Sequence, residues 1–436
     1  MSFIPNQSLQ SLLNTYLERL AAEEELQPAE IREAVMAGTM TLLANPNHPN
    51  VEPLLVGQPS RVKVNANLGT SPFCNNPDRE LSKLEIALAA GTDTVMDLSI
   101  AGDLDGIRRK VIANCRKPVG TVPIYSVAQR ILDAGGDVAS LNPEDLFREI
   151  EHQAEQGVDF MTVHCGVTRR AAAWAAEPGN RIMGIVSRGG SMLARWMREN
   201  GQENPLLEEY DRILDIASRY NVVLSLGDGL RPGAGADAGD IAQWEEVLEL
   251  GRLAARARKR GVQVMIEGPG HVPLNEVEAQ IRGIKGATGG APLYVLGPLT
   301  TDVATGWDHI AGAIGGALAV RAGVDFLCYL TPAEHLTLPD KEDVRQGVMA
   351  SRVAAQVGEV ALGRPRALKR EKVLSQARRD LDWQAMRTAS LDPETLDLRR
   401  KEHSSEEACA MCGEFCAVKM LRPKESAELC SQKKKG

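Results

Sequence analysis

The sequence predicts an α/β fold, a (β/α)8 TIM-type barrel with a small N-terminal unit and a helical C-terminal segment. Short runs rich in Val, Ile and Leu recur from residue 61 onward, each followed by glycine and polar residues and then by a helical pattern. Strands that alternate with helices form a parallel sheet, and eight or nine such units over about 270 residues fit a closed barrel better than an open sheet. Polar residues also gather after nearly every strand, where barrel enzymes place their active sites.

The composition is that of an ordinary globular protein. The 436 residues are 43% apolar and 25% charged, and the net charge of -8 argues against a general binder of nucleic acids or membrane surfaces. No apolar run approaches the roughly 20 residues of a transmembrane helix, and the polar, acidic start does not resemble a secretory signal. The eight cysteines do not suggest a disulfide framework, so we expect a reducing, cytoplasmic location.

The chain divides into three predicted domains. Residues 1–60 contain two helical patterns and are expected to form a helical unit for packing or oligomerisation. Residues 61–362 are expected to form the barrel with the substrate site. Residues 363–436 begin with two helix breakers and are expected to be helical, with a charged helix around 369–386 and a cysteine cluster on a mobile loop.

Nine segments are candidate barrel strands, one more than a closed (β/α)8 barrel requires. We therefore expect one of them to be an accessory strand or no strand at all. Helical patterns separate them, of which 145–156 and 241–260 are examples. The candidates in chain order are 62–67, 94–98, 119–124, 160–164, 182–187, 222–226, 262–267, 293–297 and 324–330.

The segment Ser187-Arg188-Gly189-Gly190 lies between a candidate strand and a helix expected to start near Ser191. Two glycines permit close backbone approach, a helix N-terminus offers unpaired N–H groups, and Arg188 adds a planar fork of donors. These features favour a phosphate cradle. The alternative is a tight turn capped by Ser191.

Two further strand ends carry groups that can bind ligands. The loop 228–233 places Asp228 and Arg231 three residues apart, as a polar ligand site or as a structural ion pair at the barrel mouth. His271 and His335 each follow a strand and have a carboxylate nearby in sequence, so they are candidate metal ligands. A structural role in hydrogen bonding is the alternative for both histidines.

His164 and Cys165 are adjacent and could suggest a nucleophile with its base. Neighbouring residues on a strand point to opposite faces, so we expect His164 in the site and Cys165 in the core. The scattered thiols Cys74, Cys115 and Cys328 are interpreted as buried or incidental.

The strongest metal signal is the C-x2-C-x3-C cluster formed by Cys409, Cys412 and Cys416. Three thiolates leave one iron of a four-iron cluster, or one position on a zinc ion, without a protein ligand, and chemistry can take place there. An iron–sulfur cluster is favoured because paired C-x2-C knuckles are missing. The alternative is a structural zinc, with Cys430 or His403 as the fourth ligand.

Together these motifs resemble the phosphomethylpyrimidine synthase family, radical S-adenosylmethionine enzymes that make the thiamin pyrimidine; the family includes 5-hydroxybenzimidazole synthase paralogues. The resemblance extends from about residue 63 to residue 420 and rests on many uncommon strings in the same order. These strings are 65–71, 96–99, 120–125, 160–166, 187–190, 225–233, 267–275, 294–302, 308–310 and 328–339.

The resemblance implies a homodimeric lyase whose C-terminal domain brings a [4Fe–4S] cluster, held by Cys409, Cys412 and Cys416, to the barrel mouth. Reduction through an electron donor would cleave S-adenosylmethionine to a 5′-deoxyadenosyl radical. The radical would start the rearrangement of 5-aminoimidazole ribonucleotide to the pyrimidine phosphate, with loss of formate and carbon monoxide. His271 and His335 would bind a second metal, usually zinc. The implied substrate-binding residues are Asn67, Met96, Tyr125, His164, Ser187, Arg188, Gly189, Asp228, Gly229, Leu230, Arg231, Glu267 and Tyr294.

Three departures from the family pattern are visible. The cluster spacing is one residue shorter than the C-x2-C-x4-C of longer members, and the large N-terminal extension of those members is absent. The chain also reads Thr305-Gly306-Trp307 where the family usually has Pro-Gly-Tyr. The last departure leaves room for a paralogue, a 5-hydroxybenzimidazole synthase that uses the same substrate for cobamide biosynthesis. A hypothesis of a different class is a non-catalytic barrel with a structural zinc on its tail, acting as a binding module.

Overall fold

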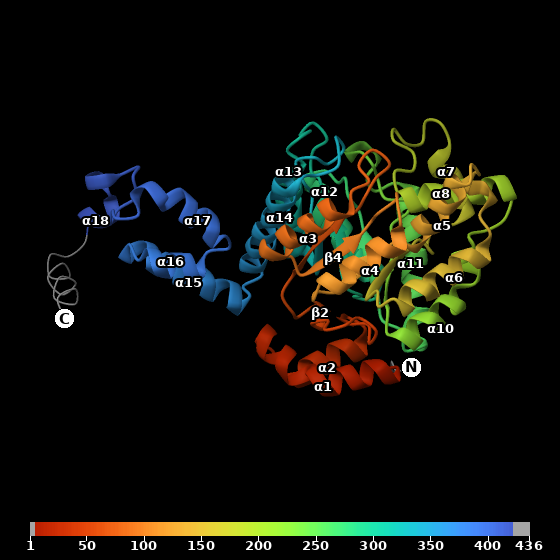
Figure 1. The fold of residues 1–436 in the computed structure, drawn as a ribbon, viewed down its shortest axis with the longest axis horizontal. Coiled ribbons are helices and arrows are strands. Elements are labelled where there is room, and N and C mark those ends of the chain that lie inside the picture. The colour runs from red at the N-terminus through yellow and green to blue at the C-terminus, as the bar shows by residue number, and fades with distance from the viewer. Residues whose placement is uncertain (1–4, 422–436) are drawn as a thin grey trace. The chain divides into compact units, whose positions relative to one another are not determined.

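The computed structural model describes residues 5–421, and its largest part is a closed barrel of parallel strands (Figure 1). The strands follow one another around the barrel in chain order, and the last, β10, pairs with the first, β3. The prediction of a (β/α)8 barrel is thus confirmed. The strands are β3 (Lys63–Leu68), β4 (Thr94–Asp97), β5 (Val119–Thr121), β6 (Phe160–Val163), β7 (Val223–Leu226), β8 (Val264–Gly268), β9 (Leu293–Leu296) and β10 (Phe326–Cys328).

The fifth of the nine candidate strands, 182–187, was predicted wrongly. This segment is an irregular connection that leads into a helix and takes no part in the barrel. Ile182 is 75% exposed and Met183 53% exposed, so the apolar pattern there does not mark a buried strand.

Helices surround the barrel and connect its strands. Several begin with proline in the first turn behind an asparagine cap: Asn76 accepts a hydrogen bond from the N–H of Arg79, and Asn142 from that of Glu144. The helices are α3 (Pro77–Ala89), α4 (Leu104–Asn114), α5 (Pro123–Asp133), α6 (Pro143–Glu155), α7 (Arg169–Ala176), α8 (Arg188–Asn200), α9 (Pro205–Glu208), α10 (Tyr210–Tyr220), α11 (Ile241–Lys259), α12 (Leu274–Ala287), α13 (Asp308–Ala322) and α14 (Lys341–Ala361).

Aromatic rings fill the barrel interior. The Tyr294 ring stacks on Phe326 with centroids 4.2 Å apart, and Phe326 meets Phe160 edge-on at 6.3 Å. Gly120 on β5 makes room for this packing, because a Cβ atom there would lie 2.3 Å from the Phe160 ring. The interior is therefore a packed core and not a pore, and it supports whatever lies above it.

The N-terminal residues form a unit with its own small core, built from α1 (Gln7–Glu24), α2 (Pro28–Ala37) and a hairpin of β1 (Met40–Leu43) and β2 (Leu54–Gly57). The hairpin was not predicted. The helices lie together at one end of the barrel (Figure 1). Gln263, just before β8, accepts a hydrogen bond from the N–H of Leu42 at 2.7 Å, and Asp159, before β6, accepts from the N–H of Asn45 at 2.7 Å. The unit therefore covers the N-terminal ends of the strands.

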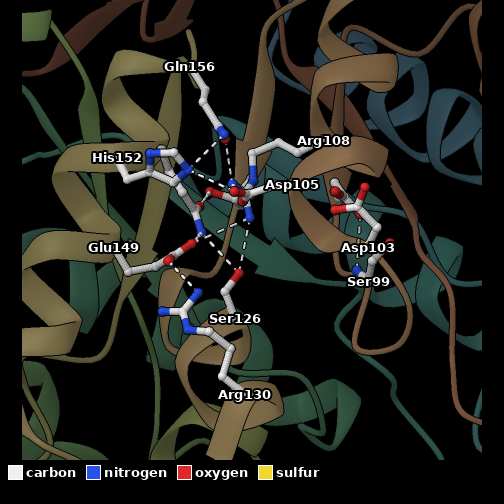
Figure 2. A network of polar contacts seen from close by, with 12 residues as sticks. Ser99, Asp103, Asp105, Arg108, Ser126, Arg130, Glu149, His152 and Gln156 are labelled. Carbon is white, nitrogen blue, oxygen red and sulfur yellow. Dashed lines mark hydrogen bonds and ion pairs between the residues drawn. The ribbon is translucent and has the colours of Figure 1, made fainter. Parts of the chain in front are cut away.

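Figure 2 shows a buried polar network that joins α4, α5 and α6 on the outside of the barrel. Arg108 donates to Ser126 Oγ at 3.0 Å and pairs with Glu149 at 3.5 Å, and Arg130 pairs with the other Glu149 oxygen at 2.8 Å. Arg108 and Glu149 are both almost fully buried, so each compensates the charge of the other. The network fixes the spacing of these three helices.

The described residues form two compact units, which are divided between Leu362 and Gly363. The second consists of α15 (Pro365–Asp380), α16 (Trp383–Ala389), α17 (Pro393–Arg400), short 3-10 turns and α18 (Ala417–Met420). The single helix predicted around 369–386 is interrupted at Leu381, whose φ of 52° ends α15. Within residues 5–421 we find no helix with the length and apolar character needed to cross a membrane.

Candidate active site at the barrel mouth

A cavity of about 190 Å³ opens at the C-terminal ends of the barrel strands. Residues from nearly every strand end contribute to it, as the sequence pattern predicted. The predicted site residues that line it are Asn67, Met96, Tyr125, His164, Ser187, Arg188, Asp228, Arg231, Glu267 and Tyr294. The side of the barrel that carries this cavity is opposite to the end covered by the N-terminal unit.

The predicted cradle is the N-terminus of α8, which begins at Arg188 and not near Ser191. The N-cap is Ser187, whose Oγ accepts a hydrogen bond from the N–H of Gly190 at 3.1 Å. The Arg188 guanidinium lies over the Tyr125 ring, 4.6 Å from its centroid. This cation–π contact holds the charge at the cavity wall, where an anion could reach it together with the helix N-terminus.

Two glycines bring α8 against its neighbours. A Cβ atom on Gly189 would lie 2.2 Å from the His164 ring, and one on Gly190 would lie 2.2 Å from the carbonyl oxygen of Gly229. Gly189 and Gly229 do not line the cavity themselves. Their role is to let the start of α8 approach closely the residues that follow β6 and β7.

His164 follows β6 and is neutral. Burial, aided by the charge of Arg231, lowers its pKa to about 3. Its Nε2 lies 3.2 Å from Ser187 Oγ, while its buried Nδ1 has no hydrogen-bond partner among the described residues. Cys165 is fully buried in the core, as expected.

The loop after β7 supplies the Asp228–Arg231 ion pair, 3.0 Å long. Burial raises the pKa of Asp228 to about 8, although Arg231 opposes this shift. Leu230 is fully buried and does not line the cavity; its N–H donates to Glu246 on α11 at 2.8 Å. Nothing in the sequence signalled Glu246, because its role depends on how α11 packs under this loop.

The cavity floor is a network of uncharged polar groups. Asn65 donates to the Tyr294 hydroxyl at 2.9 Å, and that hydroxyl donates to Met96 Sδ at 3.6 Å. Asn67 Nδ2 donates to Cys328 Sγ at 3.1 Å. Cys328 is buried, as one of the two interpretations had it, and it also lines the cavity, which the sequence did not indicate; burial raises its pKa to about 12.

Glu267 is the carboxylate of β8 in this cavity. Thr162 and Ser225 donate to the same oxygen, Oε1, at 2.6 and 2.8 Å. Burial raises the pKa of Glu267 despite these hydrogen bonds. Its second oxygen, Oε2, is in neither of these two bonds, so the carboxylate retains capacity to accept from a ligand.

The two predicted metal histidines come together, with ring centroids 5.3 Å apart. Asp302 lies 2.8 Å from Nδ1 of His271, and Asp308 lies 3.4 Å from Nδ1 of His335. Carboxylates on Nδ1 orient an imidazole so that Nε2 can bind a metal. His335 has a φ of 60°, a strained conformation for a non-glycine residue and one that is common at functional sites.

A second cavity of about 250 Å³ adjoins the first and shares Asn67, Leu98, Arg188 and Glu334 with it. It is lined by the residues after β3, including Gly69 and Ser71, and by those after β10. The sequence analysis did not predict this second cavity.

Comparison with known proteins assigns the chain to a protein family. A model of the Radical SAM ThiC family matches residues 6–423. The chain belongs to the Radical SAM ThiC family. It is 48% identical over 411 residues to the phosphomethylpyrimidine synthase of Desulforamulus reducens, covering 94% of this chain and 95% of that protein. The synthase of Moorella thermoacetica is 50% identical, covering 93% of this chain and 94% of its own length. A dihydropteroate synthase structure from Coxiella burnetii aligns with 74% of this chain and 99% of its own at 12% identity and a TM-score of 0.43, too distant to bear on function.

Membership of the Radical SAM ThiC family confirms the expectation of a radical enzyme that uses a [4Fe–4S] cluster and S-adenosylmethionine. The second unit of this ThiC-family chain carries the three candidate cluster cysteines. Cys412 and Gly413 donate their N–H groups to the carbonyl of Cys409 at 3.3 and 3.1 Å, which forms a tight turn. The N–H of Cys412 lowers the pKa of the Cys409 thiol, and Cys409 raises the pKa of the Cys412 thiol.

The donor set therefore fits an iron–sulfur cluster by its chemistry, with three unoxidised thiols in one short loop. Within residues 5–421, no group of three or more potential ligands is already gathered to hold a metal ion. For the zinc alternative, His403 lies exposed in a 3-10 turn, and Cys430 lies outside the described residues.

Proposed function

We propose that this chain is a phosphomethylpyrimidine synthase, a lyase that rearranges 5-aminoimidazole ribonucleotide to 4-amino-5-hydroxymethyl-2-methylpyrimidine phosphate in thiamin biosynthesis. The observation that carries the proposal is the near full-length identity of 48–50% to proteins of that name. The polar cavity at the barrel mouth gives independent support, because its groups match the parts of such a substrate.

The phosphate of the ribonucleotide is assigned to the N-terminus of α8. Arg188 provides a guanidinium fork, and the α8 N-terminus provides a positive dipole end and backbone N–H groups. A neutral His164 beside Ser187 can donate to or accept from the ligand without adding charge. Gly189, Gly229 and Leu230 shape this wall through their backbone.

The ribose and the amino-substituted ring are assigned to the remaining walls. Asn67, Glu267 and Tyr294 can accept or donate hydrogen bonds there, and Met96 offers an apolar contact. Asp228, held by Arg231 at 3.0 Å, is a further polar group of this wall that can hydrogen-bond to the ring.

Cys409, Cys412 and Cys416 are proposed to hold the [4Fe–4S] cluster. When bound, the cluster and S-adenosylmethionine supply the radical that starts the rearrangement. The second cavity is the proposed site for S-adenosylmethionine, because it shares Arg188 and Glu334 with the first and so places the two ligands side by side. An electron donor is required as a partner, since the cleavage is reductive.

His271 and His335 are proposed as protein ligands of a second metal, zinc. Their neighbouring rings and the carboxylates on both Nδ1 atoms support this assignment. His335→Ala should lower the zinc content of the purified chain, measured by elemental analysis, whereas His152→Ala on α6 should leave it unchanged. An equal zinc content in His335→Ala would remove the assignment.

A homodimer is proposed on the basis of α13 and α14, which leave apolar side chains exposed at helical spacing: Ile310 and Ile314 on α13, and Val353 and Val357 on α14. Such apolar helix faces are typical of subunit contacts. Ile314→Glu should convert a dimer to a monomer, as measured by light scattering. A wild-type monomer would contradict the proposal.

The free thiols of the described residues support a reducing, cytoplasmic location.

The decisive experiment is anaerobic turnover of the reconstituted chain with 5-aminoimidazole ribonucleotide, S-adenosylmethionine and a reductant, with mass analysis of the products. We expect the pyrimidine phosphate. Formation of 5-hydroxybenzimidazole would replace the proposal with the paralogous activity. A colourless, inactive protein after iron and sulfide reconstitution would favour a non-catalytic barrel with a zinc tail.

A further inference from the structure

Two side chains hold the backbone carbonyls of the three residues directly before the cluster loop, Glu406, Glu407 and Ala408. Arg400 donates from Nη2 to the carbonyl of Glu406 at 2.7 Å and from Nη1 to that of Ala408 at 3.2 Å. Trp383 Nε1 donates to the carbonyl between them, that of Glu407, at 2.9 Å. Three successive backbone groups are thus fixed immediately before Cys409.

The two side chains also hold each other. The Arg400 guanidinium lies over the Trp383 ring, 3.7 Å from its centroid. Trp383 is the first residue of α16 and Arg400 the last of α17, so each starts from the end of a helix. A planar guanidinium that stacks on a ring keeps its fork of N–H groups in one orientation, which suits it to hold two carbonyls at once.

Contacts also stabilise the cysteine loop itself. Ala408 and Cys416 are both buried, 7% exposed each, although most of the residues between them are exposed. On the far side of the loop, Lys419 pairs with Glu414 at 3.2 Å and approaches Glu407 at 3.9 Å. The loop is therefore anchored at both ends, and the end before Cys409 depends on Arg400 and Trp383.

We propose that Arg400 and Trp383 form a clamp that positions the cysteine loop 409–416 and tunes the reduction potential of the cluster it holds. The proposal rests on the proposed function, in which these cysteines bind the cluster. Both are positioning residues that act through the backbone. Because Arg400 bonds the carbonyl of the residue before Cys409, its positive charge favours the more negative, reduced form of a cluster nearby.

The test uses the full chain with three clamp variants and one matched control. Arg400→Gln removes the positive charge and the paired N–H donors of the guanidinium. Arg400→Lys keeps the positive charge but not the paired donors. Trp383→Phe keeps an aromatic ring but loses the indole N–H donor. Arg399→Gln is the control, because the neighbouring Arg399 lies on the same helix, is exposed and makes no hydrogen bond or ion pair to the described residues.

Hydrogen exchange on the metal-free chain measures the loop directly. We expect faster exchange over residues 404–416 in Arg400→Gln and Trp383→Phe and unchanged exchange in Arg399→Gln. After anaerobic reconstitution, Arg400→Gln should lose iron to a chelator about tenfold faster, as the loss of hydrogen bonds from a charged donor implies. Its midpoint potential should be more negative than that of the wild type, and Arg400→Lys should restore the potential but not the resistance to chelation.

The clamp would be refuted if Arg400→Gln had the same hydrogen-exchange rates, the same rate of iron loss to a chelator and the same midpoint potential as the wild type. If the wild-type chain itself takes up no cluster, the proposed function fails and the tuning role fails with it. The hydrogen-exchange result identifies this case, because it reports the hold on the loop without any metal. If Arg400→Gln loses helical circular dichroism, Trp383→Phe takes its place in the hydrogen-exchange comparison, because it removes one hydrogen bond to the backbone and keeps an aromatic ring beside Arg400.

Discussion

The contact between Gly190 and Gly229 offers the sharpest test of the phosphate cradle. Gly190→Ala places a Cβ atom 2.2 Å from the Gly229 carbonyl oxygen, where ordinary contacts begin at 3.4 Å. The start of α8 and the loop after β7 must therefore separate by about 1 Å, which costs roughly 1–3 kcal/mol as overpacking. A displacement of about 1 Å in a binding site can reduce turnover on the order of 100-fold. We expect that loss in the anaerobic assay, with weaker binding of 5-aminoimidazole ribonucleotide.

Two glycines outside the cavity provide matched controls. Gly251→Ala on α11 produces a similar clash, with its Cβ 2.4 Å from the Ala287 carbonyl oxygen. It should lower the melting temperature as much as Gly190→Ala while leaving substrate affinity unchanged. Gly286→Ala on α12 meets no atom within 4 Å and should stabilise the protein by roughly 0.5–1 kcal/mol. If Gly190→Ala binds the substrate as tightly as Gly251→Ala does, the cradle does not lie at this contact.

Three further predictions follow from individual contacts. Cys412→Ala should abolish turnover and leave the thermal transition of the barrel unchanged, because Cys412 lies outside the barrel unit; activity in that variant would refute the cluster assignment. Arg188→Ala should weaken binding of the ribonucleotide by roughly 1.5–3 kcal/mol in titration calorimetry, with partial recovery in Arg188→Lys. Burial alone would lower the pKa of His48, but the hydrogen bond with Asp159 and the negative charge of Asp159 raise the pKa overall. The charged form of His48 therefore stabilises the fold below this raised pKa. That stabilisation should be lost as pH rises from about 6.5 through the raised pKa, and His48→Gln should flatten the melting temperature over that window.

The barrel and most of the cavity lining could be predicted because both follow from local patterns. Period-two apolar runs mark strands, and in a parallel barrel all their C-terminal ends meet at one mouth. His164 could be separated from Cys165 for the same reason, since alternate residues face opposite sides. The segment 182–187 failed this logic because its apolar residues are exposed in a connection, and burial is not visible in a short sequence pattern.

What the sequence could not predict depends on packing between distant segments. Glu246 supports the loop after β7 from α11, and Cys328 meets Asn67 across 261 positions of sequence. A lone cysteine or glutamate carries no spacing signal, so neither could be distinguished from an ordinary core or surface residue. The N-terminal hairpin was missed because its strands have four residues each and no two-residue turn between them.

The placement of charge in the cavity explains how one site could hold an anionic nucleotide and still permit radical chemistry. The permanently cationic groups, Arg188 and Arg231, belong to the helix start and to the loop after β7. The floor instead consists of amides, a phenol, a thioether and a thiol, and burial keeps both the phenol of Tyr294 and the thiol of Cys328 protonated. The floor thus offers groups that hydrogen-bond but carry no charge, while Arg188 holds the phosphate at the start of α8; the carboxyl groups of Glu267 and Glu334 also line the cavity. Asp228 does not disturb this separation, because Arg231 lies 3.0 Å from it and compensates its charge at the cavity wall.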